Sequence, residues 1–159
     1  MCDSRSITFF NTLTILKLKK LLLFIINNKI MELEYLTDRL IGKMVGGAIT
    51  SLDGYIWSAT PGFYDYEDDL PQMGLESCFE KNSYAKTYGI YFRNSLYLLT
   101  SCTENMIIAQ NYEQSFVFSK CKRCIVLGYV DDQYPLDECV KAITELADML
   151  RESNLEEYF

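Results

Sequence analysis

Histidine is absent from the 159-residue chain, and proline occurs only three times. Without histidine the chain cannot use an imidazole as a general acid or base, cannot form a Ser-His-Asp or Cys-His arrangement, and lacks the most common zinc ligand. A Gly-rich loop that would cradle a phosphate is also missing. These absences argue against an enzyme, and we predict no catalytic residues.

Basic residues are in the minority, with 15 Lys and Arg against 22 Asp and Glu, for a net charge of −7. Sequence-independent binding to nucleic acids relies on Lys and Arg that neutralise phosphates, so we expect no nucleic-acid partner. The hydrophobic content of 49% and the aromatic content of 14% are sufficient for a folded core. The length fits one domain of ordinary size.

The six cysteines are Cys2, Cys78, Cys102, Cys121, Cys124 and Cys139. We find no convincing signal peptide and therefore expect reduced, mostly buried thiols. The spacing Cys121-Lys-Arg-Cys124 is typical of metal and redox motifs, but a zinc site needs a second ligand pair and the sequence offers none. A redox pair is favoured at a helix N-terminus, whereas this pair lies on a turn between strands. We interpret it as a structural turn and predict no metal and no cofactor.

Residues 1–30 differ in composition from the remainder and contain a single acidic residue, Asp3. The apolar run 21–26 is too short to span a bilayer, which needs about 20 apolar residues. Three interpretations remain open: an extension that is not part of the functional protein, an amphipathic arm that touches a membrane, or a divergent targeting segment. We place the start of the domain at Met31, so the domain covers residues 31–159.

Hydrophobic periodicity predicts an amphipathic helix over 31–42, a short helix over 70–80 and a second amphipathic helix over about 135–151. The acidic stretch 64–69 lacks the spacing of an EF-hand loop, and we interpret it as a solvated helix start. Strands are predicted on both sides of Asp53-Gly54 and over 88–92, 96–100, 104–109, 115–119 and 123–129. Helix, hairpin, short helix, meander and helix in this order predict an α+β domain, with an antiparallel sheet flanked by helices.

The Asp53-Gly54 pair predicts a tight hairpin turn, because both residues tolerate a positive φ. The second strand of this hairpin carries Trp57, the only tryptophan of the chain. A strand presents it at a fixed place on one face, where it is either part of the core or an aromatic docking point.

Three blocks of the sequence resemble the profilin family, and more specifically the fungal type. The block 35–42 (Tyr-Leu-Thr-Asp-Arg-Leu-Ile-Gly) is similar to the opening helix of the family. The block 53–59 (Asp-Gly-Tyr-Ile-Trp-Ser-Ala) resembles its Asp-Gly-x-x-Trp-Ala hairpin, and the segment 128–150, with Leu-Ala-Asp-Met-Leu at its end, resembles its last strand and helix. The resemblance covers 31–159 and implies terminal helices on one face of the sheet and short helices on the other.

The resemblance implies a non-enzymatic protein of the cytoplasm and cytoskeleton that binds monomeric actin and regulates its polymerisation by sequestering monomers. The residues at matching positions of the actin face are Ile108, Gln110, Lys120, Lys141, Thr144 and Glu145. The run 106–110 carries no charge where relatives often carry basic residues. We expect a monomer, with weak phosphoinositide binding because the overall charge is acidic. The basic stretch 120–123 is either a solvated turn or a contact for a partner or lipid.

The resemblance also implies a second face that holds proline-rich segments between the two terminal helices. The residues at matching positions are Leu33, Leu36, Trp57, Met149, Leu150 and Leu155. Leucine and methionine replace most of the family's aromatic residues there, and they provide no ring to stack on prolines. Tyr35, Tyr158 and Phe159 are close enough in sequence to substitute. The prediction is therefore a weakened proline-rich-ligand site, and the alternative is an interaction module of this fold that has lost actin or polyproline binding.

Overall fold

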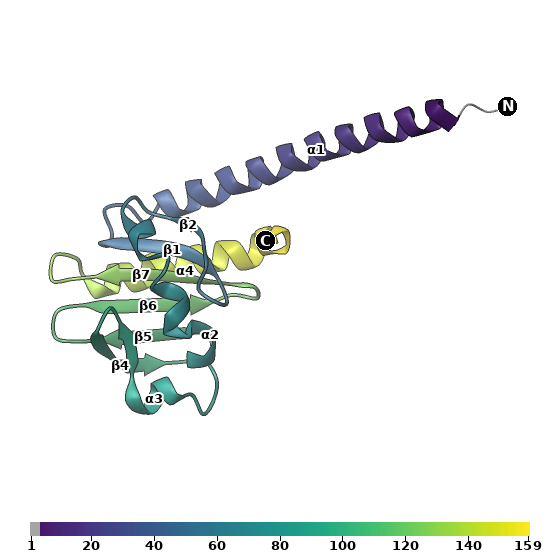
Figure 1. Cartoon of the computed structure of the whole chain (residues 1–159). Helices are drawn as coiled ribbons and strands as arrows, with labels where there is room; N and C mark the ends of the chain where they lie inside the picture. Colours follow the sequence, from purple (N-terminus) through teal and green to yellow (C-terminus); the bar gives the residue numbers. More distant parts are fainter. Residues whose placement is uncertain (1–3) are drawn as a thin grey trace.

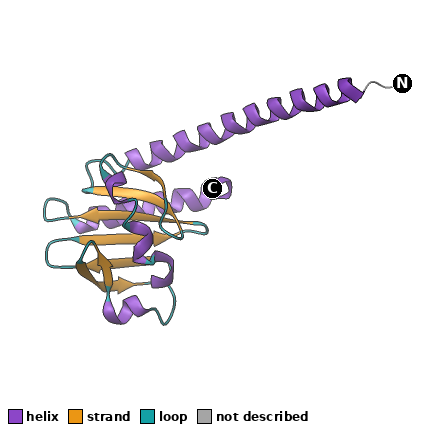
Figure 2. Cartoon of the chain, in the orientation of Figure 1, coloured by secondary structure: helices purple, strands orange, loops and turns teal. Residues whose placement is uncertain are grey.

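A seven-stranded antiparallel sheet forms the centre of the molecule, which we describe from a computed structural model that covers the backbone of residues 4–159 and the side chains of residues 11–159. Two long helices, α1 (Ser4–Asp38) and α4 (Leu136–Ser153), contact one face of the sheet (Figures 1 and 2). Short helices pack on the other face. The predicted α+β class and the placement of the helices are confirmed.

The strands follow each other in the spatial order β2-β1-β7-β6-β5-β4-β3. Their bounds are β1 Gly46–Ser51, β2 Ile56–Ala59, β3 Ile90–Phe92, β4 Ser95–Cys102, β5 Met106–Gln110, β6 Ser115–Lys120 and β7 Cys124–Val130. The last five form an antiparallel meander that closes onto the first hairpin where β7 pairs with β1. The predicted meander is confirmed, with strand ends shifted by at most two residues.

Both faces of the central strands are buried, because alternate side chains of a strand point to opposite faces. In β6, Phe116 and Phe118 belong to the core beneath the short helices, whereas Val117 belongs to the core beneath α4. In the same way Leu127 of β7 faces the short helices and Val126 faces α4. This double burial explains why the central strands read as nearly continuous apolar runs.

Helix α1 is much longer than predicted, and the expected bounds of 31–42 are wrong at both ends. The helix already begins at Ser4. It continues without a break because the chain contains no glycine or proline before Gly42. It ends at Asp38, after which hydrogen bonds from each N–H to the carbonyl three residues earlier tighten the chain toward Gly42, whose φ is +79°. Residues 11–28 are exposed, and this part of α1 extends away from the sheet (Figure 1).

The predicted hairpin joins β1 to β2 through Asp53-Gly54. The Gly54 N–H donates to the Ser51 carbonyl, and the φ of Gly54 is +93°. A Cβ at this position would lie 2.8 Å from the carbonyl oxygen of Leu70, so the turn requires glycine both for its conformation and for its close approach to the next segment. The hairpin places Trp57 half-buried on the side of the sheet that faces α1 and α4.

The segment between β2 and β3 differs most from the prediction. The helix expected over 70–80 is divided into η2 (Leu70–Met73) and α2 (Leu75–Cys78), because Gly74 adopts a φ of +61° between them. The acidic stretch belongs to a 3-10 turn, η1 (Phe63–Tyr66). A further helix, α3 (Tyr84–Tyr88), was not predicted, and it includes the residue expected to begin a strand.

Helix α4 packs closely on β7, as its predicted apolar stripe requires. Cys139, Ile143 and Leu146 are buried against the sheet. A Cβ at Gly128 would lie 2.9 Å from the Cys139 sulfur and from Ile143, so the absence of a side chain there allows the helix to approach the strand. Among the residues whose side chains are described, no helix combines the length and apolar character needed to cross a membrane.

Candidate functional site

A groove of about 510 Å³ lies between α1 and the C-terminal segment. Its walls come from two distant parts of the sequence: Asn28, Met31, Glu32, Tyr35, Leu36, Met149, Ser153 and Leu155. The C-terminal segment is positioned by Asn154, which ends α4 with a φ of +55° and turns the chain into the 3-10 helix η3 (Leu155–Tyr158). Most of the side chains that line the groove are apolar, with a polar residue at several points.

Tyr35 lines this groove, and three more aromatic side chains lie on β2 and on the C-terminal segment, which packs against α1. The Trp57 and Phe159 rings are 5.1 Å apart between centroids and inclined by 30°. Tyr158 is exposed, and the Lys29 ammonium lies 4.8 Å from the centre of its ring. Tyr35 is 68% exposed on α1. Stacked or tilted rings with free faces and polar tips are suited to an extended, apolar ligand that still carries backbone carbonyls.

A second surface is formed by α4 and the strand β5. Ile108 and Gln110 are half-buried on the α4 side of β5. On α4, Lys141 and Glu145 are exposed and Thr144 is half-buried, with its hydroxyl donating to the Val140 carbonyl at 2.7 Å. The surface therefore combines one exposed side of α4, which carries charged side chains, with the strand β5, which carries none.

Residues 31–155 match the family model of profilin. The chain belongs to the profilin family. No curated protein sequence matches it significantly.

Solved profilin structures share the fold at low sequence identity. Profilin II of Acanthamoeba castellanii is 17% identical with a TM-score of 0.67, over 77% of this chain and 98% of that one. LokiProfilin1, solved in complex with rabbit actin, is 19% identical with a TM-score of 0.61, over 77% and 96%. Mouse profilin IIa, solved with a double repeat from the FH1 domain of mDia1, is 15% identical with a TM-score of 0.60, over 76% and 96%.

The six residues predicted for the groove fall into three groups in the structure. Leu36, Met149 and Leu155 line the groove. Leu33 and Leu150 are 1% and 0% exposed and belong to the core beneath it, so they support the groove without a surface for a ligand. Trp57 joins the aromatic group through its contact with Phe159. Met149 thus lines the groove, whereas its neighbour Leu150 belongs to the core.

The six residues predicted for an actin-binding face are only partly brought together by the structure. Lys120, at the end of β6, lies on the other face of the sheet, where its ammonium is 3.9 Å from the Glu76 carboxylate and 5.9 Å from the centre of the Phe79 ring. Glu145, one helical turn after Lys141 on α4, lines a small cleft shared with Arg39 and Met149.

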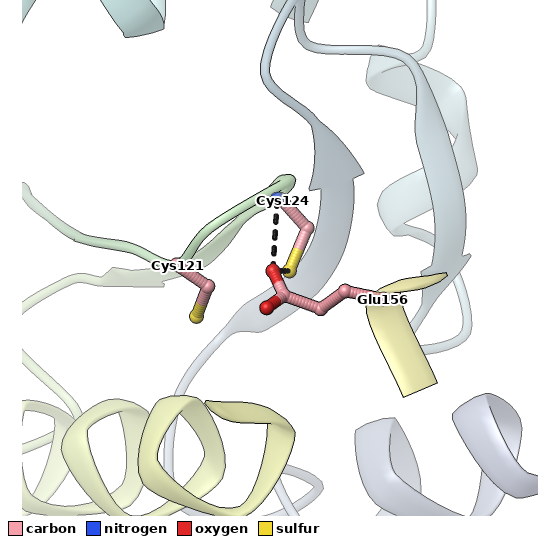
Figure 3. Close-up of side chains that lie close together, drawn as sticks. All are labelled: Cys121, Cys124 and Glu156. Atoms are coloured by element: carbon pink, nitrogen blue, oxygen red, sulfur yellow. Dashed lines mark hydrogen bonds between the residues drawn. The ribbon is translucent and has the colours of Figure 1, made fainter. Parts of the chain in front are cut away.

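The structure contains a buried carboxylate, Glu156, that the sequence did not predict as a site residue. Glu156, in η3, is 5% exposed, and its Oε1 accepts hydrogen bonds from the backbone N–H groups of Arg123 and Cys124 at 2.9 and 3.1 Å. The Cys124 thiol also donates to this oxygen at 3.0 Å (Figure 3). Cys121, Cys124 and Glu156 are all buried, and one ligand atom of each lies within 4.8 Å of the others. These are the described residues that could hold a metal ion.

Buried and exposed thiols are expected to differ sharply in reactivity. Burial raises the pKa of the Cys139 thiol from its ordinary value of 9.0 to about 12, which lowers its thiolate fraction in mildly alkaline buffer about 1000-fold. In native protein treated with iodoacetamide in mildly alkaline buffer, mass spectrometry should find Cys102, which is exposed, alkylated long before Cys139. Labelling of both at similar rates would contradict the packing of α4 on β7, and urea-unfolded protein is the control.

Proposed function

We propose that this chain binds monomeric actin and regulates actin polymerisation and the organisation of the cytoskeleton, and that it acts in the cytoplasm as a non-enzymatic protein. The observation that carries the proposal is the profilin family match, which covers residues 31–155 and therefore every element from the end of α1 to the start of η3. The similarity in fold to LokiProfilin1, which was solved in complex with rabbit actin, supports it.

The contact surface that we propose consists of the exposed edge of α4 and the neighbouring part of β5. Lys141, Thr144, Ile108 and Gln110 remain its candidates. The strand contributes no charge, so the helix provides the ionic part of the interface. We place Lys120 at the margin at most, because its side chain is engaged with Glu76 on the other face of the sheet.

Reversal of the charge at Lys141 is expected to weaken actin binding about tenfold, which corresponds to about 1.4 kcal/mol. The substitution Lys141→Glu replaces an exposed ammonium with a carboxylate. An actin surface that is complementary to the native positive charge would repel this carboxylate. Affinity is measured by fluorescence titration or by sedimentation with monomeric actin. Because Lys141 is exposed, the thermal unfolding midpoint should not change.

The matched control is Lys81→Glu, an equally exposed lysine in the loop between α2 and α3. It makes the same change of net charge away from α4 and should leave the affinity unchanged. Equal loss in both variants would indicate an effect of net charge alone. If the unmodified chain forms no complex with actin at tens of micromolar protein, the proposal fails and a profilin-fold module with another partner replaces it.

We also propose that the groove between α1 and the C-terminal segment holds a proline-rich segment. The supporting observation is a set of four rings, with Tyr35 in the lining of the groove and Trp57, Phe159 and Tyr158 on β2 and the C-terminal segment. A polyproline II helix presents flat pyrrolidine rings and unpaired carbonyls, which match aromatic faces and phenol or indole donors. Three of these four rings stand at positions other than the usual ones of the family, so the platform is rearranged.

The functional domain that we propose is residues 31–159. The family match begins at residue 31, and residues 11–28 of α1 are exposed. Lys29 does contact Tyr158, however, and Asn28 lines the groove. A chain that begins at Met31 should therefore bind actin as the full chain does, and any difference should appear in binding of proline-rich peptides.

A further inference from the structure

Two cysteines and a glutamate meet beneath the turn between β6 and β7. Cys121 and Cys124 flank Lys122-Arg123, and the Cys121 N–H donates to the Cys124 carbonyl at 2.8 Å, which closes a two-residue hairpin turn. Both cysteines belong to the core beneath α4. Figure 3 shows how Glu156 reaches them from the C-terminal segment. We propose that Cys121, Cys124 and Glu156 form a binding site for a divalent cation of the zinc class, with two thiolates and one carboxylate oxygen as ligands.

The spacing of the three side chains fits such a cation. Zinc–sulfur bonds of about 2.3 Å at tetrahedral angles place two sulfur atoms about 3.8 Å apart. The ligand atoms of the cluster lie within 4.8 Å of one another, so side-chain movements of about 1 Å are enough to close the site. Such movements are available to thiols and to a glutamate by small rotations of their side chains.

The Glu156 carboxylate is oriented before any cation binds. Its Oε1 accepts two backbone N–H groups from the turn that also carries the cysteines. Hydrogen bonds of this kind fix a ligating side chain and increase its affinity for metal. They leave the second oxygen of the carboxylate for the cation. The hydrogen bond from the Cys124 thiol to Oε1 is the one that a cation replaces.

The charges around the cluster also favour a divalent cation. Two thiolates and a carboxylate carry three negative charges, and a divalent cation reduces this to one. Lys120, Lys122, Arg123 and Arg151 line the adjoining cavity together with Glu104 and Glu157, so the lining outside the cluster has an excess of positive charge that offsets the remaining negative charge. Soft thiolate ligands select zinc-class ions over magnesium and calcium, which prefer oxygen ligands only.

Each thiol must lose its proton to ligate a cation, because the thiolate sulfur is the ligand. Binding releases both thiol protons to solvent as two metal–sulfur bonds form.

A path to the cluster exists. A cavity of about 570 Å³ is lined by Cys121 and Glu156 and also by exposed side chains of the β6–β7 turn and of the C-terminal segment. It gives a cation access, and it leaves room for a water molecule as the fourth ligand. Glu156 lies 32 residues beyond Cys124, so the complete ligand set exists only in the folded chain.

The test uses the full-length protein, reduced and freed of metal, titrated with Co²⁺ and then with Zn²⁺. Binding of one Co²⁺ per chain should produce thiolate-to-cobalt charge-transfer bands in the near ultraviolet, and Zn²⁺ should displace the cobalt and abolish them. The variants Cys121→Ser and Cys124→Ser should lose the bands. Glu156→Gln retains a carbonyl oxygen for the two backbone N–H groups and should weaken binding at least tenfold.

The control variant is Cys102→Ser, which removes an exposed cysteine outside the cluster and should bind Co²⁺ as the unmodified chain does. Absence of charge-transfer bands in the unmodified protein would overturn the proposal, as would bands that survive loss of both Cys121 and Cys124. Should the serine variants fail to fold, X-ray absorption of the unmodified zinc complex decides. Two sulfur ligands at about 2.3 Å and oxygen at about 2.0–2.2 Å support the site, and oxygen or nitrogen ligands alone refute it.

Discussion

Replacement of Phe116 with alanine is expected to lower the free energy of unfolding by about 3–5 kcal/mol. Phe116 is fully buried at the centre of β6. Four rings surround it, with centroid distances of 4.7–5.6 Å, from Phe92, Tyr97, Phe118 and Tyr129. The loss is large because the rings stand on four different strands and cannot all move inward to fill the space. Urea unfolding followed by circular dichroism measures it.

Two further variants separate cavity formation from other effects. Phe116→Leu keeps most of the volume and should cost less than about 1.5 kcal/mol. Tyr112→Ala removes a fully exposed ring at the β5–β6 turn and should change stability by less than about 0.5 kcal/mol. A loss below 1 kcal/mol for Phe116→Ala would show that the described aromatic packing is wrong.

Replacement of Trp57 with alanine is expected to reduce affinity for a polyproline peptide at least about 30-fold, or about 2 kcal/mol. The indole provides a flat face and an N–H donor, and it also supports Phe159, so its removal affects two rings of the groove. Isothermal titration calorimetry measures the affinity of unmodified and variant chains, and Trp57 fluorescence reports binding to the unmodified chain independently.

Controls for this experiment come from the same chain. Trp57→Phe retains a ring and should recover part of the affinity. Tyr88→Ala disrupts a second pair of exposed rings, because Tyr84 and Tyr88 stack at 4.3 Å on α3, away from the groove. Loss of binding in Tyr88→Ala with normal binding in Trp57→Ala would move the proline-rich site to α3.

Much of the fold could be predicted because its strands and turns are encoded locally. Asp53-Gly54 joins β1 to β2, and Arg93-Asn94 joins β3 to β4. Arg93 and Asn94 have φ values of +46° and +66°, and both pairs form tight hairpin turns. The division at Gly74 and the start of α1 at Ser4 were missed for opposite reasons. Gly74 breaks a segment whose apolar pattern is helical. The first 38 residues, in contrast, contain no glycine or proline that would stop a helix. The change of composition near residue 31 suggested a boundary where the helix in fact continues.

The candidate sites were less predictable because they depend on contacts between distant segments. The CxxC pair is visible in the sequence, but its third partner, Glu156, appears as one of several acidic residues near the C-terminus. Only the left-handed turn at Asn154 sends it back to the sheet. In the same way, Leu33 and Leu150 have the sequence positions of groove residues, but their burial depends on how α1 and α4 pack on the sheet. A signal was present in the terminal Tyr158-Phe159, whose rings contact Lys29 and Trp57.

The C-terminal turn η3 has two ends that serve different surfaces. Glu156 is held by the β6–β7 turn, and Phe159, three residues later, rests on Trp57. The Phe159 N–H also donates to the Glu156 carbonyl at 3.5 Å, so the two residues belong to one backbone turn. We expect a ligand that displaces one end to shift the other. Any such coupling is reciprocal, so a cation at the thiol cluster and a peptide at the proposed groove site would change each other's affinity by the same factor. Residues 156–159 would carry this coupling between the two ligands.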